Sequence, residues 1–255
     1  RQRGHLNSDG TRLERSNDPY HAGHHLSRSV ARVKLLSGMA RIRHGAPGMP
    51  TGNRRHRSMV ESHLSLAPVL QPSPDAWLEL VLANFDEFLR DHASCEKKAS
   101  GMAMSVAAHY PDQPDLVTAM VDLAVEELNH YREVIRILLA RGLTPGPDHK
   151  DPYIHKLNAL VRRGPEKFLL DRLLIGAVVE RRGAERFACI ATGLNEPELR
   201  KFYDTITESE EQHWHLFIDL ALNNYAADTV WSRFRHLSEQ ENSIMTTLPL
   251  RSALH

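Results

Sequence analysis

Apolar side chains recur every three or four residues through most of the chain beyond Ser73, which is the period of an amphipathic α-helix. The first apolar stretch begins with the features of a helix start. Ser73 offers a hydroxyl cap, Pro74 stands at the first helical position, and Asp75 is an early acidic residue. Clusters of proline and glycine separate the apolar stretches. The sequence therefore predicts four long helices, over residues 73–109, 114–141, 165–192 and 196–224, and two shorter ones, over 152–162 and 228–241.

No segment of useful length alternates between apolar and polar residues, so no β-strand is expected and the predicted fold class is all-α. No run of about 18 apolar residues is present, which argues against a membrane span. The first residues are polar and basic and lack the apolar core of a secretion signal. We therefore expect a cytoplasmic protein with no membrane partner.

Charge is distributed unevenly along the chain. The whole sequence is formally neutral, with 32 Lys and Arg against 32 Asp and Glu. Residues 1–58 carry 12 Lys and Arg against three acidic residues, a net charge of +9, so the remainder carries −9. This first segment also lacks a sustained apolar period, which is typical of disorder. The predicted organisation is a basic disordered segment over 1–58 and a helical bundle domain over 59–255.

Three interpretations of residues 1–58 stay open. The segment is an arm that binds nucleic acid, or it is an organelle transit peptide, since it is rich in arginine and poor in acidic residues. The third interpretation is that Met59 is the natural start, because helical patterning begins only a few residues later. In that case, residues 1–58 are not part of the native protein.

Residues that can bind metal ions stand on all four long helices, in the order Glu, Glu-x-x-His, Glu, Glu-x-x-His. Residues i and i+3 share one face of a helix, so each Glu-x-x-His pair can present a carboxylate and an imidazole together. Four carboxylates and two imidazoles suit two iron or manganese ions in the core of a helical bundle. The six candidate ligands are Glu96, Glu127, His130, Glu180, Glu210 and His213.

The spacing of the four glutamates supports this interpretation. Glu96 and Glu127 are 31 residues apart, with a predicted turn near the middle of the interval. Glu180 and Glu210 are 30 residues apart and are arranged in the same way. In an antiparallel hairpin, each pair of glutamates then lies at one height along the axis. Two such halves, joined by a link long enough to cross along the bundle, predict a ferritin-like four-helix bundle with additional short helices.

Two further features leave alternatives open. Glu126 with His130, and Glu211 with His215, form i, i+4 pairs beside the preferred ones, and a single Glu-x-x-His pair is usually part of a solvated face. We retain the i, i+3 pairs because both helices offer one.

Four small residues flank Glu180: Gly176, Ala177, Gly183 and Ala184. They either leave room for dioxygen and a substrate beside the metal ions or only allow close helix packing.

Cysteine use excludes two other classes of protein. The chain contains only Cys95 and Cys189, so neither a disulfide framework nor a four-cysteine iron or zinc site can form. A rubredoxin-like centre is therefore absent.

The helices that carry the candidate ligands resemble a known family. Residues 62–242 are similar to the MiaE-type tRNA hydroxylases, ferritin-like di-iron proteins that act on 2-methylthio-isopentenyl-adenosine next to the anticodon. The similarity lies in the stretches Leu66-Ala-Pro-Val-Leu70, Asp91-His-Ala-Ser-Cys-Glu-Lys-Lys-Ala99, Glu126-Glu-Leu-Asn-His-Tyr131, Gly176-Ala-Val-Val-Glu-Arg-Arg-Gly-Ala-Glu-Arg-Phe187 and Glu208-Ser-Glu-Glu-Gln-His-Trp-His215.

The resemblance implies a non-haem di-iron centre and an oxygen-dependent hydroxylation of the isopentenyl side chain. By their positions in the motifs, the six candidate ligands would bind the two iron ions, with dioxygen as co-substrate. External electrons are required. Nothing in the chain resembles a flavin or iron–sulfur domain, so a separate electron-donor reductase is expected as a partner.

The resemblance also implies the tRNA anticodon loop as a partner. Lys97, Lys98, Arg181 and Arg182 directly follow two of the candidate ligands, and they would point off the metal face and contact phosphates. The alternative is that they belong to solvated helix surface. Two other function classes stay open: a ferritin-like di-metal oxidase or peroxidase that acts on small molecules, and an iron-storage protein.

Overall fold

The computed structural model describes residues 65–255, and all the regular secondary structure among them is helical, which confirms the predicted class. The prediction for residues 1–58 concerns residues outside this part of the chain. The helices are α2 (Asp75–Ala83), α3 (Phe85–His109), α4 (Pro114–Ala140), α5 (Pro152–Asn158), α6 (Pro165–Gly193), α7 (Pro197–Asn224) and α8 (Ala227–Thr247).

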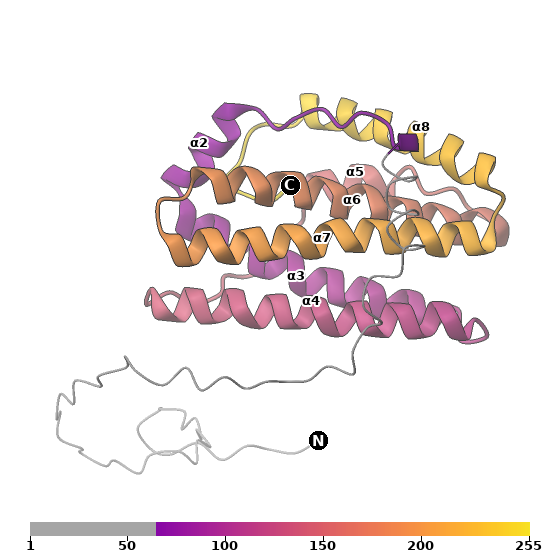
Figure 1. The fold of residues 1–255 in the computed structure, drawn as a ribbon, viewed down its shortest axis with the longest axis horizontal. Coiled ribbons are helices and arrows are strands. Elements are labelled where there is room, and N and C mark those ends of the chain that lie inside the picture. The colour runs from indigo at the N-terminus through magenta and orange to yellow at the C-terminus, as the bar shows by residue number, and fades with distance from the viewer. Residues whose placement is uncertain (1–64) are drawn as a thin grey trace, which may run out of the picture. The chain divides into compact units, whose positions relative to one another are not determined.

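Two antiparallel hairpins form the body of the bundle. Helix α3 pairs with α4 and α6 pairs with α7, and the two hairpins lie side by side (Figure 1). The connection over residues 141–164 contains α5 and carries the chain from one hairpin to the other. Helix α8 packs mainly on α6. This is the four-helix bundle with additional helices that the glutamate spacing predicted.

One predicted long helix is divided in two. Residues 73–109 form α2 and α3, which are separated at Asn84, where the backbone (φ −129°, ψ 44°) leaves the helical region. The side-chain amide of Asn84 donates to the carbonyl of Leu80 at 3.0 Å and so competes with the helical pattern. The division allows α2 to pack on α6 and to bury Trp77 and Val81.

The ends of the helical region also differ from the predictions. Ser73 does not cap α2, because Pro74 occupies that position. The N–H and hydroxyl of Ser73 instead donate to Glu185 on α6, at 2.7 and 2.8 Å. The last helix extends to Thr247 rather than ending at residue 241, and its final turns pack Ile244 and Met245 against the core.

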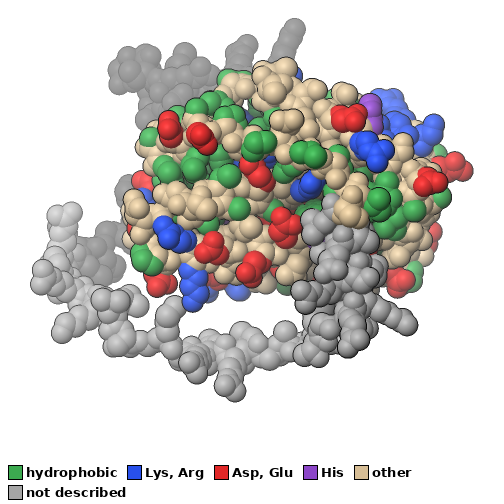
Figure 2. Space-filling view, turned by 45° about the horizontal axis from the view of Figure 1, so that its top comes forward, with side chains coloured by type: hydrophobic (Ala, Val, Ile, Leu, Met, Phe, Trp, Pro, Cys, Tyr) green, Lys and Arg blue, Asp and Glu red, His purple; other side chains and the backbone are tan. Residues whose placement is uncertain are grey.

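Within residues 65–255, none of the helices combines the length and the hydropathy required to cross a membrane. The face around α8 carries acidic, basic and apolar side chains interspersed with one another (Figure 2). The apolar faces of the long helices meet inside the bundle, where Leu173, Trp214 and Phe217 are fully buried.

Candidate metal centre

Six carboxylate and imidazole side chains from the four long helices meet inside the bundle. They form two overlapping groups: Glu96, Glu127, His130 and Glu210 make one, and Glu127, Glu180, Glu210 and His213 make the other. In each group the potential ligand atoms lie within 4.8 Å of one another. Glu127 and Glu210 belong to both groups. The structure thus brings together all six residues that the spacing selected, around two adjacent positions that share two carboxylates.

Several donor atoms of this cluster have no hydrogen-bond partner within the described residues. They are both carboxylate oxygens of Glu127 and the Nδ1 atoms of His130 and His213, all of which are buried. Both Nδ1 atoms face Glu127. Nδ1 of His130 lies 3.5 Å from its Oε2 atom, and Nδ1 of His213 lies 2.9 Å from its Oε1 atom. Buried polar atoms are normally satisfied, and a pair of divalent cations would satisfy these. The donor set therefore fits a di-metal site.

Without cations, the carboxylates stand in an unfavourable environment. Burial, and then the charge of Glu210, raise the pKa of Glu180 well above its usual value. Burial and the charge of Glu96 also raise the pKa of Glu127. Burial alone would lower the pKa of His130, but Glu127 and Glu96 outweigh it and raise this pKa to about 10. Bound cations would offset the repulsion among the carboxylates and favour their ionised forms.

A buried histidine and a buried tyrosine hold Glu96 in place. Nε2 of His92, one turn earlier on α3, lies 2.6 Å from Oε1 of Glu96. Nδ1 of His92 lies 3.1 Å from the hydroxyl of Tyr203 on α7, and both side chains are fully buried. Polar contacts of this kind orient the ligands of metal sites. Sequence analysis missed both residues, and the i−4 position of His92 relative to Glu96 was the available signal.

A second polar contact supports His213. Glu126 accepts a hydrogen bond from the hydroxyl of Ser209 at 2.6 Å and lies 3.4 Å from Nε2 of His213. Glu126 thus stands beside the cluster, so the alternative i, i+4 pair on α4 does not form at the centre. Glu211 accepts a hydrogen bond from Nε1 of Trp214 at 2.8 Å and belongs to neither group. The i, i+3 pairs are therefore the ones that face the interior.

A cavity of about 970 Å³ opens beside the cluster and borders all four of its carboxylates. It is bounded by α3 and α6, and also by α5, residues 149–152 and the chain end at Leu254 and His255. Its walls include the apolar residues Ala99, Met102, Ile175, Val179 and Phe187. An apolar cavity with a few convergent polar groups is typical of a small-molecule or cofactor site.

Two of the four small residues around Glu180 border this cavity. Gly176 and Gly183 line it. Ala177 and Ala184 are fully buried and do not line it, so for these two residues the interpretation of close helix packing is the one that fits. Their methyl groups contribute to helix packing instead.

The two glycines have different surroundings. A Cβ added at Gly183 would meet only ordinary contacts, the nearest at 3.8 Å from Oε2 of Glu210. A Cβ added at Gly176 would lie 2.8 Å from ring carbons of Phe217, so this glycine permits α6 and α7 to approach closely. Gly183 is therefore the position at which a small residue leaves space beside the centre.

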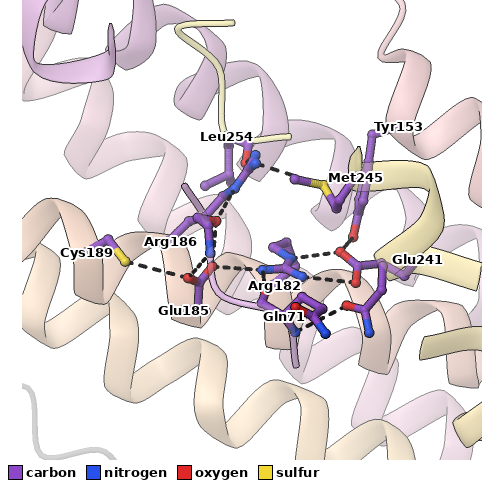
Figure 3. A network of polar contacts seen from close by, with 11 residues as sticks. Gln71, Tyr153, Arg182, Glu185, Arg186, Cys189, Glu241, Met245 and Leu254 are labelled. Carbon is purple, nitrogen blue, oxygen red and sulfur yellow. Dashed lines mark hydrogen bonds and ion pairs between the residues drawn. The ribbon is translucent and has the colours of Figure 1, made fainter. Parts of the chain in front are cut away.

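The predicted RNA-contacting arginines on α6 have structural partners. Arg182 is 1% exposed and donates to both carboxylate oxygens of Glu241 on α8, at 2.7 and 3.0 Å, and to the carbonyl of Gln71 at 2.7 Å (Figure 3). Arg181 donates to the carbonyl of Pro68 at 2.8 Å. The prediction that Arg182 contacts RNA is wrong, because its charge joins α6 to α8 and to the segment before α2.

The predicted lysines on α3 are exposed. Nζ of Lys97 contacts both carboxylate oxygens of Asp148, at 2.8 and 2.9 Å, and Nζ of Lys98 donates to the carbonyl of His149 at 2.9 Å. Lys98 also borders the cavity, whereas Lys97 does not. Of the four basic residues selected from the sequence, Lys98 is the one that stands at the cavity.

The fold and the centre together define a class of protein. A bundle of two hairpins, with one glutamate from each of two helices and a Glu-x-x-His pair from each of the other two, is the ferritin-like di-metal carboxylate architecture. The chain belongs to the tRNA-(MS[2]IO[6]A)-hydroxylase (MiaE) family, whose model matches residues 62–255. The resemblance drawn from the sequence motifs is thereby confirmed.

Individual relatives agree with this membership. A Pseudomonas putida protein named tRNA 2-(methylsulfanyl)-N(6)-isopentenyladenosine(37) hydroxylase is 40% identical over 152 residues, which are 60% of this chain and 74% of the relative. A Salmonella typhimurium protein of the same name is 27% identical over 233 residues, covering 71% of this chain and 86% of the relative. A solved structure, "Protein 43 with aldehyde deformylating oxygenase activity from Synechococcus", has a TM-score of 0.69 and 31% identity, and covers 72% of this chain and 93% of its own.

Proposed function

We propose that this protein is an oxygen-dependent di-iron monooxygenase that hydroxylates the isopentenyl group of 2-methylthio-isopentenyl-adenosine in tRNA, next to the anticodon, in the cytoplasm. The observation that carries the proposal is the cavity of about 970 Å³ that borders all four carboxylates of the centre. A prenyl group is apolar, and this cavity offers it aliphatic and aromatic walls. Family membership and the names of the two hydroxylases support the choice of substrate.

The six side chains of the centre would hold two iron ions. Glu96, Glu127, His130, Glu180, Glu210 and His213 would be their ligands, and Glu127 and Glu210 belong to both groups of potential ligand atoms. His92, through its contact with Glu96, would keep one of these ligands oriented. Bound iron would supply the capacity to bind and reduce dioxygen.

The part of the protein itself is to orient the prenyl group and to exclude water. Ile175, Val179 and Phe187 on α6 line the cavity and would pack against the prenyl carbons. Hydroxylation of a C–H bond inserts one oxygen atom of dioxygen and releases the other as water, which consumes two electrons and two protons. We therefore propose that a separate reductase supplies the electrons.

A small-molecule oxygenase is the second candidate. It is favoured by the Synechococcus protein, whose name gives aldehyde deformylating oxygenase activity and whose fold matches with a TM-score of 0.69. A cavity of this volume would also accommodate an aliphatic chain. The two candidates differ in whether RNA is required.

The test is turnover by the reduced, iron-loaded protein with dioxygen and an anticodon stem-loop that carries the modified adenosine. Mass spectrometry of the digested nucleosides is expected to show one added oxygen atom on that adenosine. The Glu127→Ala, Glu210→Ala double variant removes both shared carboxylates and is expected to lower iron affinity by at least about tenfold and to abolish turnover. Full iron content in this variant would contradict the metal assignment. Oxidation of a fatty aldehyde with unchanged RNA would favour the second candidate.

A further inference from the structure

The cavity continues along α6 away from the metal centre. Residues 172, 176, 180, 183 and 187 all border it and recur at three- and four-residue spacing, so they form one stripe on the helix. Arg172 lies eight residues before Glu180, which corresponds to about 12 Å along the helix axis. An arginine therefore lines the same cavity as the candidate metal ligands, at a distance from them.

Arg172 has no acidic partner among residues 65–255. Burial lowers the pKa of its guanidinium, and of the groups in the described part of the chain only the phenol of Tyr110 acts in the opposite direction. Arg162 provides a contrast, because Asp171 lies 2.7 Å from it and raises its pKa. A half-buried guanidinium without a carboxylate is poorly compensated, so an anion that enters the cavity would stabilise it.

Further basic groups border the same cavity from other elements. Lys98 on α3 and Lys150 in the connection before α5 line it, and so do His149 and His155. All four side chains are exposed. Because they are both exposed and part of the lining, they mark the place where the cavity opens to the surface. The mouth of the cavity is therefore basic.

The carboxylates near this mouth are already engaged. Apart from the four glutamates of the centre, Asp151 is the one acidic residue of the described chain that lines the cavity, and it lies 3.4 Å from Arg251 and 3.6 Å from His255. Asp148 does not line the cavity and pairs with Lys97. The positive charge at the mouth thus lacks a full complement of protein anions.

We propose that Arg172 inside the cavity, together with Lys98 and Lys150 at its mouth, binds phosphates of the RNA backbone beside the target nucleotide. This inference rests on the proposed function and names the contacts that hold its substrate. Arginine binds phosphate through two parallel hydrogen bonds, and lysine binds it as a point charge. With the backbone held there, the base extends along the stripe on α6. The axial separation of about 12 Å between Arg172 and Glu180 leaves a length of the stripe between a phosphate at Arg172 and the centre, along which the base and its prenyl group would lie.

The experiment compares four variants of the full iron-loaded chain with the wild type. Arg172→Gln and Lys150→Gln each remove one proposed phosphate contact, and Arg136→Gln removes an exposed charge on α4 that does not border the cavity. Binding of a stem-loop RNA that carries the prenylated adenosine is measured by fluorescence anisotropy over a range of salt concentrations. We expect Arg172→Gln to weaken binding about tenfold and to reduce the salt slope by about 0.7, while Arg172→Lys recovers the slope. Arg136→Gln is expected to follow the wild type.

A kinetic measurement separates a phosphate contact from a change in cavity shape. The ratio of kcat/KM for the RNA to kcat/KM for the free modified nucleoside, which has no phosphate, is expected to fall about tenfold in Arg172→Gln. An equal loss on both substrates would overturn the inference. If Arg172→Gln fails to fold, Lys150→Gln decides the matter, because its side chain is exposed on a connection. An unchanged salt slope in an active protein would refute the phosphate contacts alone, whereas a wild type that modifies no RNA would refute the proposed function.

Discussion

Gly183 offers a sharp test of the cavity, because the helix and the cavity make opposite demands at this position. It lies in the middle of α6, where glycine costs about 0.5–1 kcal/mol relative to alanine. An added Cβ would stand 3.8 Å from Oε2 of Glu210 and 3.9 Å from Cε2 of Phe187, which are ordinary van der Waals contacts. Gly183→Ala is therefore expected to stabilise the protein, whereas Gly183→Leu would place three further carbons in the space next to Glu210.

The expected magnitudes follow from these contacts. For a domain of this size, a gain of about 1 kcal/mol corresponds to a rise in Tm of about 2–4 °C, so Gly183→Ala is expected to melt a few degrees higher. Gly176→Ala is the matched control on the same helix, because its Cβ would lie 2.8 Å from the ring of Phe217. Such overpacking costs about 1–3 kcal/mol, so this variant is expected to melt lower.

The assay combines differential scanning calorimetry, iron analysis and turnover of the prenylated stem-loop. Gly183→Leu is expected to retain iron and to lose at least about tenfold in kcat/KM, since its side chain would occupy the space proposed for the prenyl group. Wild-type turnover by an iron-loaded Gly183→Leu protein would refute the assignment of the cavity to the substrate. A lower Tm for Gly183→Ala than for Gly176→Ala would refute the packing argument.

Three further predictions concern the rest of the molecule. Arg182→Met leaves Glu241 buried without its cationic partner, with only the hydrogen bond from Tyr153 remaining within the described residues. This is expected to cost about 3–5 kcal/mol and to lower the Tm by roughly 10 °C in calorimetry. Lys97→Met, at an exposed ion pair, should change the Tm little. Tyr203→Phe removes the hydrogen bond to buried His92. It is expected to lower the free energy of unfolding, measured in urea, by about 1–3 kcal/mol and to weaken iron binding about tenfold. Unchanged iron affinity would contradict a positioning role for Tyr203. A chain that begins at Met59 is expected to match the full chain in helical content and Tm, both measured by circular dichroism, because residues 1–58 lack an apolar period. A large fall in Tm would show that residues 1–58 pack on the bundle.

Local pattern was sufficient for the helices and for the six residues of the centre. The 3.6-residue period identifies an amphipathic helix wherever one face is buried. The Glu-x-x-His pairs follow from the same geometry, because residues three apart share a face. The equal intervals within each hairpin then place its two glutamates at one height. Convergence of the six side chains required in addition that the two hairpins pack side by side with these heights matched. The same pattern could not reveal the break at Asn84, since the apolar period continues through it and the asparagine acts through its own hydrogen bond.

Contacts between distant segments decided the rest. Lys98 and Arg182 each stand two residues after a candidate metal ligand, and by pattern alone they are equivalent. Helix α8 places Glu241 over Arg182 and buries it, while none of the helices within residues 65–255 covers Lys98, which is exposed at the mouth of the cavity. The cavity beside the centre is bounded by elements as far apart in the sequence as α3, α6 and the chain end. Burial and solvent access depend on which elements pack over a residue, and that is a property of the assembled bundle rather than of the spacing along any one helix.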